Sequence, residues 1–239
     1  MASELPHTEP YRVALYWAPL VGSPGWQAGC SWLGMDAATG EALPQPAVPG
    51  VDAALMQHTT AEPRRYGWHA TIKPPFRLRA GQTLATLDAA VASLAQVLST
   101  CPMPDLQVAL LDGFVALRPG RPWPRVEALA AACVKALHPL AEPLSATELA
   151  KRRLIGLTPR QDALLQTWGY PWVLDEFRFH CSLTSRLEGL SEAQRNAVLA
   201  AAQAHFSHLP EQRLDRLSVF IEPSAGAPFR LHRQWELRP

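Results

Sequence analysis

The sequence predicts an α+β fold, and three observations support this class. Segments with the periodicity of strands and of helices follow one another as strand, helix, strand, strand from Gly67 to Arg118, and the same order returns from Phe177 to Trp235. In the first range, Asp112-Gly113 separates two apolar runs, a two-residue turn typical of antiparallel strands. The 239 residues suit one large domain or two small lobes, and no low-complexity linker divides them.

The elements of the first half follow from apolar periodicity and from residues that begin or end elements. Thr83 is typical of a helix N-cap, and Pro74-Pro75 should end the strand that precedes them. The uncharged run Val13–Met35 is interpreted as the end of a strand, a turn and a surface helix. We expect strands at Tyr11–Ala18, Gly67–Lys73, Leu106–Leu111 and Phe114–Arg118, and helices at Val51–Thr60 and Leu84–Ser99.

The second half is assigned in the same way. A cap followed by a proline at Thr158-Pro159 begins a helix, and Gly169 ends it. We expect further helices at Val126–Leu137 and Ser191–Phe206, and strands at Phe177–Thr184, Leu214–Ile221 and Phe229–Trp235. The chain has 23 prolines, which fall mainly between these segments and stiffen the loops.

The charge balance excludes bulk binding to DNA or to an anionic membrane. There are 22 Lys and Arg against 21 Asp and Glu, so no field of one sign covers the whole molecule. Only Lys73, Lys135 and Lys151 are lysines, and the other 19 basic residues are arginines, which hold phosphate and carboxylate groups as a fork. Local anion sites are therefore compatible with the composition.

Segments for membrane insertion or export are not predicted. Val13–Met35 is long enough to span a membrane, but Pro19, Pro24 and four glycines would leave backbone groups unsatisfied in lipid. The first ten residues, MASELPHTEP, lack the basic and apolar stretches of a secretory signal, so a cytoplasmic protein is expected. The four cysteines form no CxxC pair, and we expect them to be reduced structural thiols.

Each of the two ranges begins with a strand that carries a histidine followed two residues later by a hydroxyl. The two motifs read His69-Ala70-Thr71-Ile72 and His180-Cys181-Ser182-Leu183. Because side chains alternate across a strand, one face is apolar and the other presents the histidine and the hydroxyl. The expected polar sets are His69, Thr71 and Lys73 on the first strand, and Arg178, His180, Ser182 and Thr184 on the second.

Two histidines and two hydroxyls are suited to displacement at phosphorus. One neutral imidazole takes a proton from the attacking water or hydroxyl, and the other, as imidazolium, gives a proton to the leaving oxygen. Thr71 and Ser182 would hydrogen-bond the non-bridging phosphate oxygens as charge develops on them. This scheme requires no metal and no cofactor.

The paired motifs resemble the signature of the two-histidine (2H) phosphoesterase superfamily. The strings RRYGWHATIKPPFRL, LTPRQDALLQTWGYPWV and EFRFHCSLTSRL are similar to a bacterial branch encoded beside phosphonate-degradation genes, and the similarity covers roughly 11–187. Two departures are the serine at Ser182 in place of the commoner threonine and the long separation of 111 residues between the two histidines.

This resemblance implies a bilobed fold in which two pseudo-symmetric antiparallel sheets with flanking helices surround a central cleft. The whole chain, 1–239, would form a single bilobed domain, with a first motif lobe at 60–120, a helical insertion at 121–170 and a second motif lobe at 171–239. By position in the motifs, His69 and His180 would be the acid and base pair, and Thr71 and Ser182 the hydroxyls that hold the phosphate.

Other polar residues are candidates for substrate binding or for surface roles. Candidate contacts to the substrate are Lys73, Arg178, Thr184, Tyr66 and Arg64. We interpret Lys151-Arg152-Arg153 as an exposed helix face rather than a nucleic-acid patch. His205 and His208 lie three residues apart on a predicted helix, but no acidic or cysteine partner accompanies them, so no metal site is expected.

The sequence therefore favours a metal-independent phosphoesterase of the cyclic phosphodiesterase type. Its partner would be a small cyclic or diester phosphate, with ribose-cyclic phosphates of nucleotide or phosphonate metabolism the favoured class. A long nucleic acid and a membrane are not expected partners, because no basic stripe is present. Two alternatives stay open: a protein that binds nucleotides or RNA ends without turnover, and an accessory protein of phosphonate degradation.

Overall fold

Antiparallel sheets form the β structure of the protein. The computed structural model describes residues 9–239. The largest sheet has four strands in the order β2 (Ala70–Phe76), β1 (Arg12–Trp17), β8 (Arg216–Glu222) and β9 (Arg230–Glu236). A second sheet has the order β4 (Leu106–Leu111), β5 (Phe114–Pro119) and β6 (Cys181–Ser182). Two short strands, β3 (Cys101–Pro102) and β7 (Arg213–Leu214), pair with each other.

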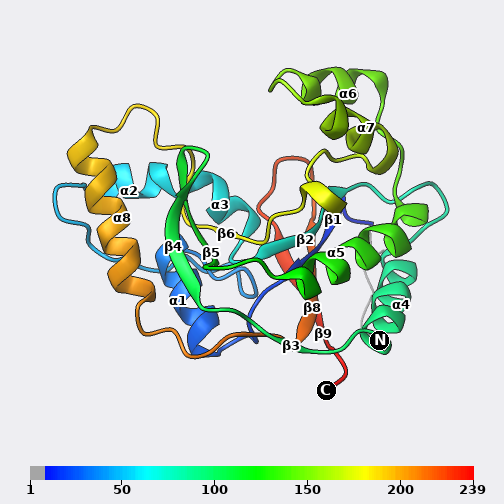
Figure 1. Cartoon of the computed structure of the whole chain (residues 1–239), viewed down its shortest axis with the longest axis horizontal. Coiled ribbons are helices and arrows are strands. Elements are labelled where there is room, and N and C mark those ends of the chain that lie inside the picture. The colour runs from blue at the N-terminus through cyan, green and yellow to red at the C-terminus, as the bar shows by residue number, and fades with distance from the viewer. Residues whose placement is uncertain (1–8) are drawn as a thin grey trace, which may run out of the picture.

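Helices cover both sheets, which gives two lobes of an α+β fold and confirms the predicted class (Figure 1). α4 and α5 pack against each other and against strands of the four-stranded sheet, whereas α8 packs against β4 and α1. α6 and α7 form a separate pair above α5 in Figure 1. The helices are α1 (Pro24–Leu33), α2 (Ala53–Thr59), α3 (Ala61–Tyr66), α4 (Leu84–Ala95), α5 (Pro124–Leu137), α6 (Ala146–Arg153), α7 (Pro159–Trp168) and α8 (Glu192–Phe206), with 3-10 turns η1 (His138–Leu140) and η2 (Leu174–Glu176).

The signals that begin and end elements act as the sequence predicts. The side chains of Thr83 and Thr158 accept hydrogen bonds from the backbone N–H of the third residue of α4 and of α7, which satisfies donors that lack a partner within the helix. Gly169 ends α7 in the left-handed conformation with φ 77°. Asp112 and Gly113 both have positive φ, 47° and 90°, as the two-residue turn between β4 and β5 requires.

The two strand–helix–strand–strand ranges exchange their first strands. β2, which follows the first motif histidine, joins the sheet of β8 and β9, while β6 of the second motif pairs with β5. The register places Ser182 opposite Ala116 and Cys181 opposite Leu117. Each sheet therefore combines strands from both 60–120 and 171–239, and neither sheet belongs to one of these ranges alone.

Several predicted boundaries are wrong. β2 begins at Ala70 and continues through Pro74 and Pro75 to Phe76, because it is an edge strand and an edge tolerates residues that cannot donate to a neighbour. The second motif strand is limited to Cys181–Ser182. α1 is not a surface helix, since Trp26, Cys30 and Trp32 are buried in the core. The helix α3 is not predicted, and α6 is predicted only as the helix face at Lys151-Arg152-Arg153.

A single large apolar core extends through both lobes. Its largest fully buried side chains include Trp17, Trp26, Trp32 and Trp68. The apolar faces predicted for the two motif strands lie in this core, with Trp68, Ala70 and Ile72 from the first and Phe179, Cys181 and Leu183 from the second. All four cysteines are free and buried. Within 9–239, no helix combines the length and apolar character that crossing a membrane would require.

Candidate active site

One cavity of about 710 Å³ collects polar residues from both motifs. His69 and Thr71 come from the start of β2, and His180 and Ser182 come from the start of β6. These strands belong to different sheets, so the exchange of strands brings residues 111 positions apart to the same cavity. The four side chains are each partly exposed, as groups that meet a ligand must be.

His69 is held in one orientation by two hydrogen bonds and one ring. Its Nδ1 lies 2.8 Å from the carbonyl oxygen of Gly67, and because a carbonyl only accepts, Nδ1 carries the proton. Its Nε2 therefore accepts, and the hydroxyl of Thr71 donates to it over 3.2 Å. The imidazole also stacks on Tyr16, with ring centroids 3.7 Å apart and 22° between planes.

His180 repeats this arrangement in the second motif. Its Nδ1 donates to the carbonyl oxygen of Arg178 at 2.8 Å, again two residues upstream. The neutral ring is thereby fixed as the tautomer whose Nε2 can accept a proton. The ring of Phe114 lies beside it, with centroids 5.7 Å apart. The two histidines thus share the Nδ1 hydrogen bond to a carbonyl two residues upstream, whereas the hydrogen bond from a hydroxyl to Nε2 is formed only at His69 among residues 9–239.

Burial keeps both imidazoles neutral at pH 7. Desolvation is the main cause that lowers the pKa of His69 to about 4, and the charge of His180 lowers it further, whereas the Gly67 carbonyl opposes both effects. Burial is also the main cause that lowers the pKa of His180. For His180, the carbonyl of Arg178 and the carboxylate of Asp112 oppose the shift. Both rings are therefore proton acceptors in the unliganded protein.

Three of the five residues predicted to contact the substrate line this cavity, namely Tyr66, Arg178 and Thr184. The Arg178 guanidinium is exposed and lies 3.5 Å from the Asp112 carboxylate. Thr184 is buried, and its hydroxyl accepts a hydrogen bond of 2.9 Å from the Val115 N–H, which fastens the second motif to β5. Thr184 therefore has a structural partner as well as a place at the cavity wall.

Lys73 does not lie beside the histidines, because a β-bulge interrupts the alternation that the sequence predicts. Tyr16 pairs with Thr71, but the next residue of β1, Leu15, pairs with Lys73, so one residue of β2 is skipped. Paired residues project to the same face of a sheet, so Thr71 shares the face of Tyr16 and Lys73 shares the opposite face with Leu15. Lys73 lines a different cavity, described below.

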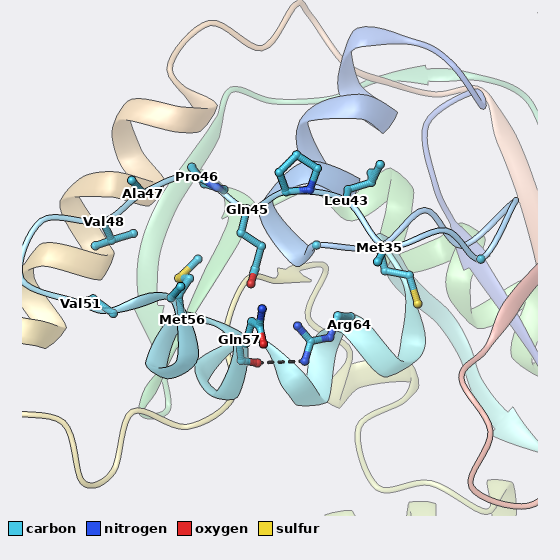
Figure 2. A pocket seen from close by; sticks show the side chains of 15 residues that line it. Met35, Leu43, Gln45, Pro46, Ala47, Val48, Val51, Met56, Gln57 and Arg64 are labelled. Carbon is cyan, nitrogen blue, oxygen red and sulfur yellow. Dashed lines mark hydrogen bonds between the residues drawn. The ribbon is translucent and has the colours of Figure 1, made fainter.

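Arg64 also lies outside the cavity of the two histidines. It lines a separate pocket of about 570 Å³ between the loop around Gln45 and the helices α2 and α3 (Figure 2). There its Nη2 donates to the Gln57 carbonyl over 3.0 Å, as the dashed line in Figure 2 shows. This pocket is mostly apolar, with methionine, valine and proline side chains, and neither motif histidine lines it.

Several cavity residues were not identified from the sequence. Arg152 lies on α6, with its guanidinium 5.9 Å from the ring centroid of Tyr170, although we expected an exposed face there. Arg12 projects from β1 on the face of Tyr16 and forms an ion pair with Glu222, which also binds Arg65 at 2.7 Å. The alternation of β1 could have identified Arg12, whereas nothing in the α6 sequence indicates its inner face.

The charge of the cavity is mixed but has more cations than anions. Arg12, Arg152, Arg178 and Arg186 line it together with Glu62, Asp112 and Glu176. Among residues 9–239, no group of three or more His, Cys, Asp and Glu side chains is arranged to hold a metal ion. The arrangement suits a small anion held between two neutral imidazoles and two hydroxyls.

Two curated relatives are similar to almost all of this chain. A protein of Janthinobacterium sp. (strain Marseille) named ribose 1,5-bisphosphate phosphokinase PhnN is 38% identical over 221 residues, which cover 91% of this chain and 49% of that protein. A protein of Laribacter hongkongensis (strain HLHK9) with the same name is 40% identical over 222 residues, or 93% of this chain and 51% of that protein. The chain thus spans about half the length of these relatives.

Two solved structures align over 97% of the chain at low similarity. The crystal structure of E. coli LigT complexed with NADP+ gives a TM-score of 0.41 at 13% identity, and that of a phosphoesterase gives 0.40 at 14% identity, each covered completely. At these values the alignments assign no activity to this chain. The family model described as "Protein of unknown function (DUF1045)" matches residues 71–230, and the chain therefore belongs to the DUF1045 family.

Proposed function

We propose that this protein is a phosphoesterase that hydrolyses a small cyclic or diester phosphate, with His69 and His180 as the proton-transfer pair. One observation supports the proposal most strongly. Each imidazole is fixed through Nδ1 to the carbonyl two residues upstream and has a hydroxyl two residues downstream, and both rings line one cavity. Such paired, pre-oriented imidazoles are what acid–base displacement at phosphorus requires.

The reaction proceeds as a displacement in which the two rings exchange one proton each with the reactants. His69 Nε2 takes a proton from water while the water oxygen forms a bond to phosphorus. The bond from phosphorus to the leaving oxygen breaks, and His180, protonated on Nε2, gives its proton to that oxygen. The product is a phosphate monoester with a free hydroxyl, and proton exchange with solvent returns both rings to their starting states.

The surroundings of the two rings favour these separate roles. His69 is stacked on Tyr16 and has a pKa lowered to about 4, so it enters the reaction neutral, as a base must. His180 faces the Asp112 carboxylate, which favours its charged form. A phosphate anion bound next to His180 would add a second negative charge and oppose the lowering of the pKa of that ring by burial, which prepares it as the acid.

The hydroxyls and Arg152 have supporting roles in this proposal. Thr71 and Ser182 donate to the non-bridging phosphate oxygens, and Thr71 leaves its hydrogen bond with His69 to do so. This change frees Nε2 of His69 for the water proton. Arg152, which lines the cavity without a hydrogen-bonded carboxylate in the described chain, compensates the charge of the phosphate.

The proposed substrate class is a cyclic phosphate of ribose or of a related small sugar. A cavity of about 710 Å³ accommodates a molecule of nucleotide size. The names of the two curated relatives concern ribose 1,5-bisphosphate, a phosphorylated pentose, although those proteins are about twice as long as this chain. A small sugar phosphate is consistent with the volume of the cavity and with the names of these relatives.

Hydrolysis of a panel of cyclic phosphates tests the proposal. The panel contains nucleoside 2′,3′-cyclic and 3′,5′-cyclic phosphates, incubated with the full chain in the presence of a chelator, with product separated by chromatography. We expect His69→Ala and His180→Ala each to lower kcat by about 10²- to 10⁴-fold, the range for loss of a general acid or base. Thr71→Val and Ser182→Ala should lower kcat less, because each removes one hydrogen bond.

His58→Ala is the matched control, since His58 is exposed on α2 and lines no part of this cavity. It should retain full activity. Turnover that survives in the double variant of His69 and His180 would exclude their proposed roles. Binding of the cyclic phosphates without turnover of any of them would favour a binding protein instead.

A further inference from the structure

A second cavity of about 330 Å³ adjoins the candidate active site. It lies between the end of β2 and the helices α6 and α7, and it shares the lining residues Arg12, Pro74, Pro75 and Arg152 with the cavity of the two histidines. Its own wall includes Lys73 and His138, which come from β2 and from the end of α5. The proposed reaction uses neither residue.

Lys73 is a buried cation that forms no ion pair with a carboxylate of residues 9–239. Only 2% of the residue is exposed, and its Nζ lies 4.8 Å from the centroid of the Phe76 ring, which partly compensates the charge. Burial lowers the pKa of Lys73 to about 8, with no carboxylate to oppose the shift. A charged group in this position is stabilised when an anion enters the cavity.

His138 supplies a second polar atom without a partner. Its Nδ1 is buried and makes no hydrogen bond within residues 9–239, while its ring meets Trp168 edge-on with centroids 5.0 Å apart. Burial is the main cause that lowers the pKa of His138, and the charges of Lys73 and Arg79, which line the same cavity, lower it further. The neutral imidazole can donate one hydrogen bond through Nδ1.

The acidic side chains of the cavity are already occupied. Glu142 and Glu148 line it, and Arg77 binds both, at 2.7 Å to each carboxylate. Lys73, Arg79 and Arg152 also line the cavity, and none of them is hydrogen-bonded to a carboxylate of residues 9–239. The cavity is therefore lined by cations without a hydrogen-bonded carboxylate, and such a space is suited to an anion.

We propose that this second cavity is a binding site for a phosphate monoester group, held by Lys73 and His138 with Arg79 and Arg152 at its rim. The group belongs either to a free sugar phosphate or to a second phosphate of the substrate in the adjoining cavity, since the two cavities meet at Arg152. A dianion fits better than a neutral group, because several cations surround the space and Glu142 and Glu148, the carboxylates that line it in the described chain, are paired.

The scarcity of lysine makes the site directly observable. The chain has three lysines, so a protein labelled with 13C-lysine gives only three sets of side-chain NMR signals, and one variant at each lysine assigns them. Titration with inorganic phosphate should shift the Lys73 signal in a saturable way and leave those of Lys135 and Lys151 unchanged. Absence of a saturable shift at phosphate concentrations up to about 20 mM would overturn the proposal.

Calorimetry with two matched variants measures the contribution of Lys73. Lys73→Met keeps the apolar stem and removes the charge, and it should weaken binding of ribose 5-phosphate by about tenfold or more, the loss expected for one charge-assisted hydrogen bond. Lys135→Met, on the exposed side of α5, should leave binding unchanged. If Lys73→Met lowers the unfolding midpoint, His138→Phe provides the same test with the lysine intact. Wild-type affinity in both cavity variants contradicts the proposed site.

Two arms distinguish the source of the phosphate. If the phosphate belongs to a free ligand, ribose 5-phosphate should bind the double variant His69→Ala, His180→Ala with wild-type affinity. If it is instead a second phosphate of the substrate, a 5′-phosphate added to a nucleoside 2′,3′-cyclic phosphate should lower KM by about tenfold in the wild type and leave it unchanged in Lys73→Met. Binding that is lost in the double histidine variant but kept in Lys73→Met would place the phosphate in the first cavity and overturn the inference. The binding arms remain valid even if no substrate is hydrolysed.

Discussion

His69→Gln tests whether the first motif histidine is held neutral by the fold. The pKa of this imidazole falls from an ordinary value of 6.5 to about 4, with burial as the main cause. Between these two values the unfolded chain binds a proton that the folded protein does not, so stability falls as the pH is lowered through 6.5 and the loss is complete below 4. Glutamine keeps a side chain that can donate to the Gly67 carbonyl but does not titrate.

The size of the effect follows from the two pKa values. Near pH 7.5 the shifted pKa of His69 changes the free energy of unfolding by almost nothing, whereas near pH 5 it lowers that free energy by about 2 kcal/mol. Urea unfolding followed by tryptophan fluorescence at both pH values gives the free energy of unfolding for wild type and variant. Titration of the other groups is common to both proteins and cancels in the comparison.

We therefore expect the wild type to lose about 2 kcal/mol more than His69→Gln between these pH values. His58→Gln, on the exposed end of α2, should follow the wild type. An equal pH dependence in wild type and His69→Gln would show that His69 titrates as in the unfolded chain. That result would also remove the reason for assigning it as the base.

Three further predictions concern the groups that position the site. Gly29→Ala should destabilise the protein by about 1 to 3 kcal/mol or more, because a Cβ there would lie 2.0 Å from the Trp68 ring next to the first motif. Thermal unfolding measures this effect, and an unchanged midpoint would contradict the close contact between Gly29 and Trp68. Thr184→Val leaves the buried Val115 N–H without an acceptor and should cost about 1 to 3 kcal/mol in urea unfolding, while Thr184→Ser restores most of it. Burial alone would raise the pKa of Glu222, but hydrogen bonds from two arginines lower it, so the wild type loses stability as the pH falls through the acidic range. In Glu222→Gln the free energy of unfolding should depend less on pH in this range, and an equal dependence in both proteins would refute this.

Local signals made much of the fold predictable. Thr158 and Gly169 mark the ends of α7 through hydrogen-bond capping and left-handed backbone, which depend on the residues themselves. Asp112-Gly113 forces the β4–β5 turn in the same way. The two motif histidines could be singled out because the His-x-hydroxyl pattern occurs twice, each time beside a residue that is buried, Trp68 or Phe179, and both rings line one cavity.

Features that depend on neighbours could not be predicted in this way. The bulge that turns Lys73 away from Thr71 is set by the pairing with β1, and no residue of β2 announces it. α6 has no buried residue, so its sequence lacks the apolar stripe that would show which side Arg152 occupies. The prolines of β2 were interpreted as a stop because an isolated sequence does not reveal that the strand lies at an edge.

The exchange of first strands also constrains the order in which the protein folds. β1 lies between β2 and β8, so after the ribosome has made β1 and β2, one edge of β1 stays unpaired until roughly 140 further residues have been synthesised. Contacts of such long sequence separation form slowly. The nascent chain is consequently exposed to edge-to-edge association during this interval, and chaperone availability during expression should affect the yield of folded protein.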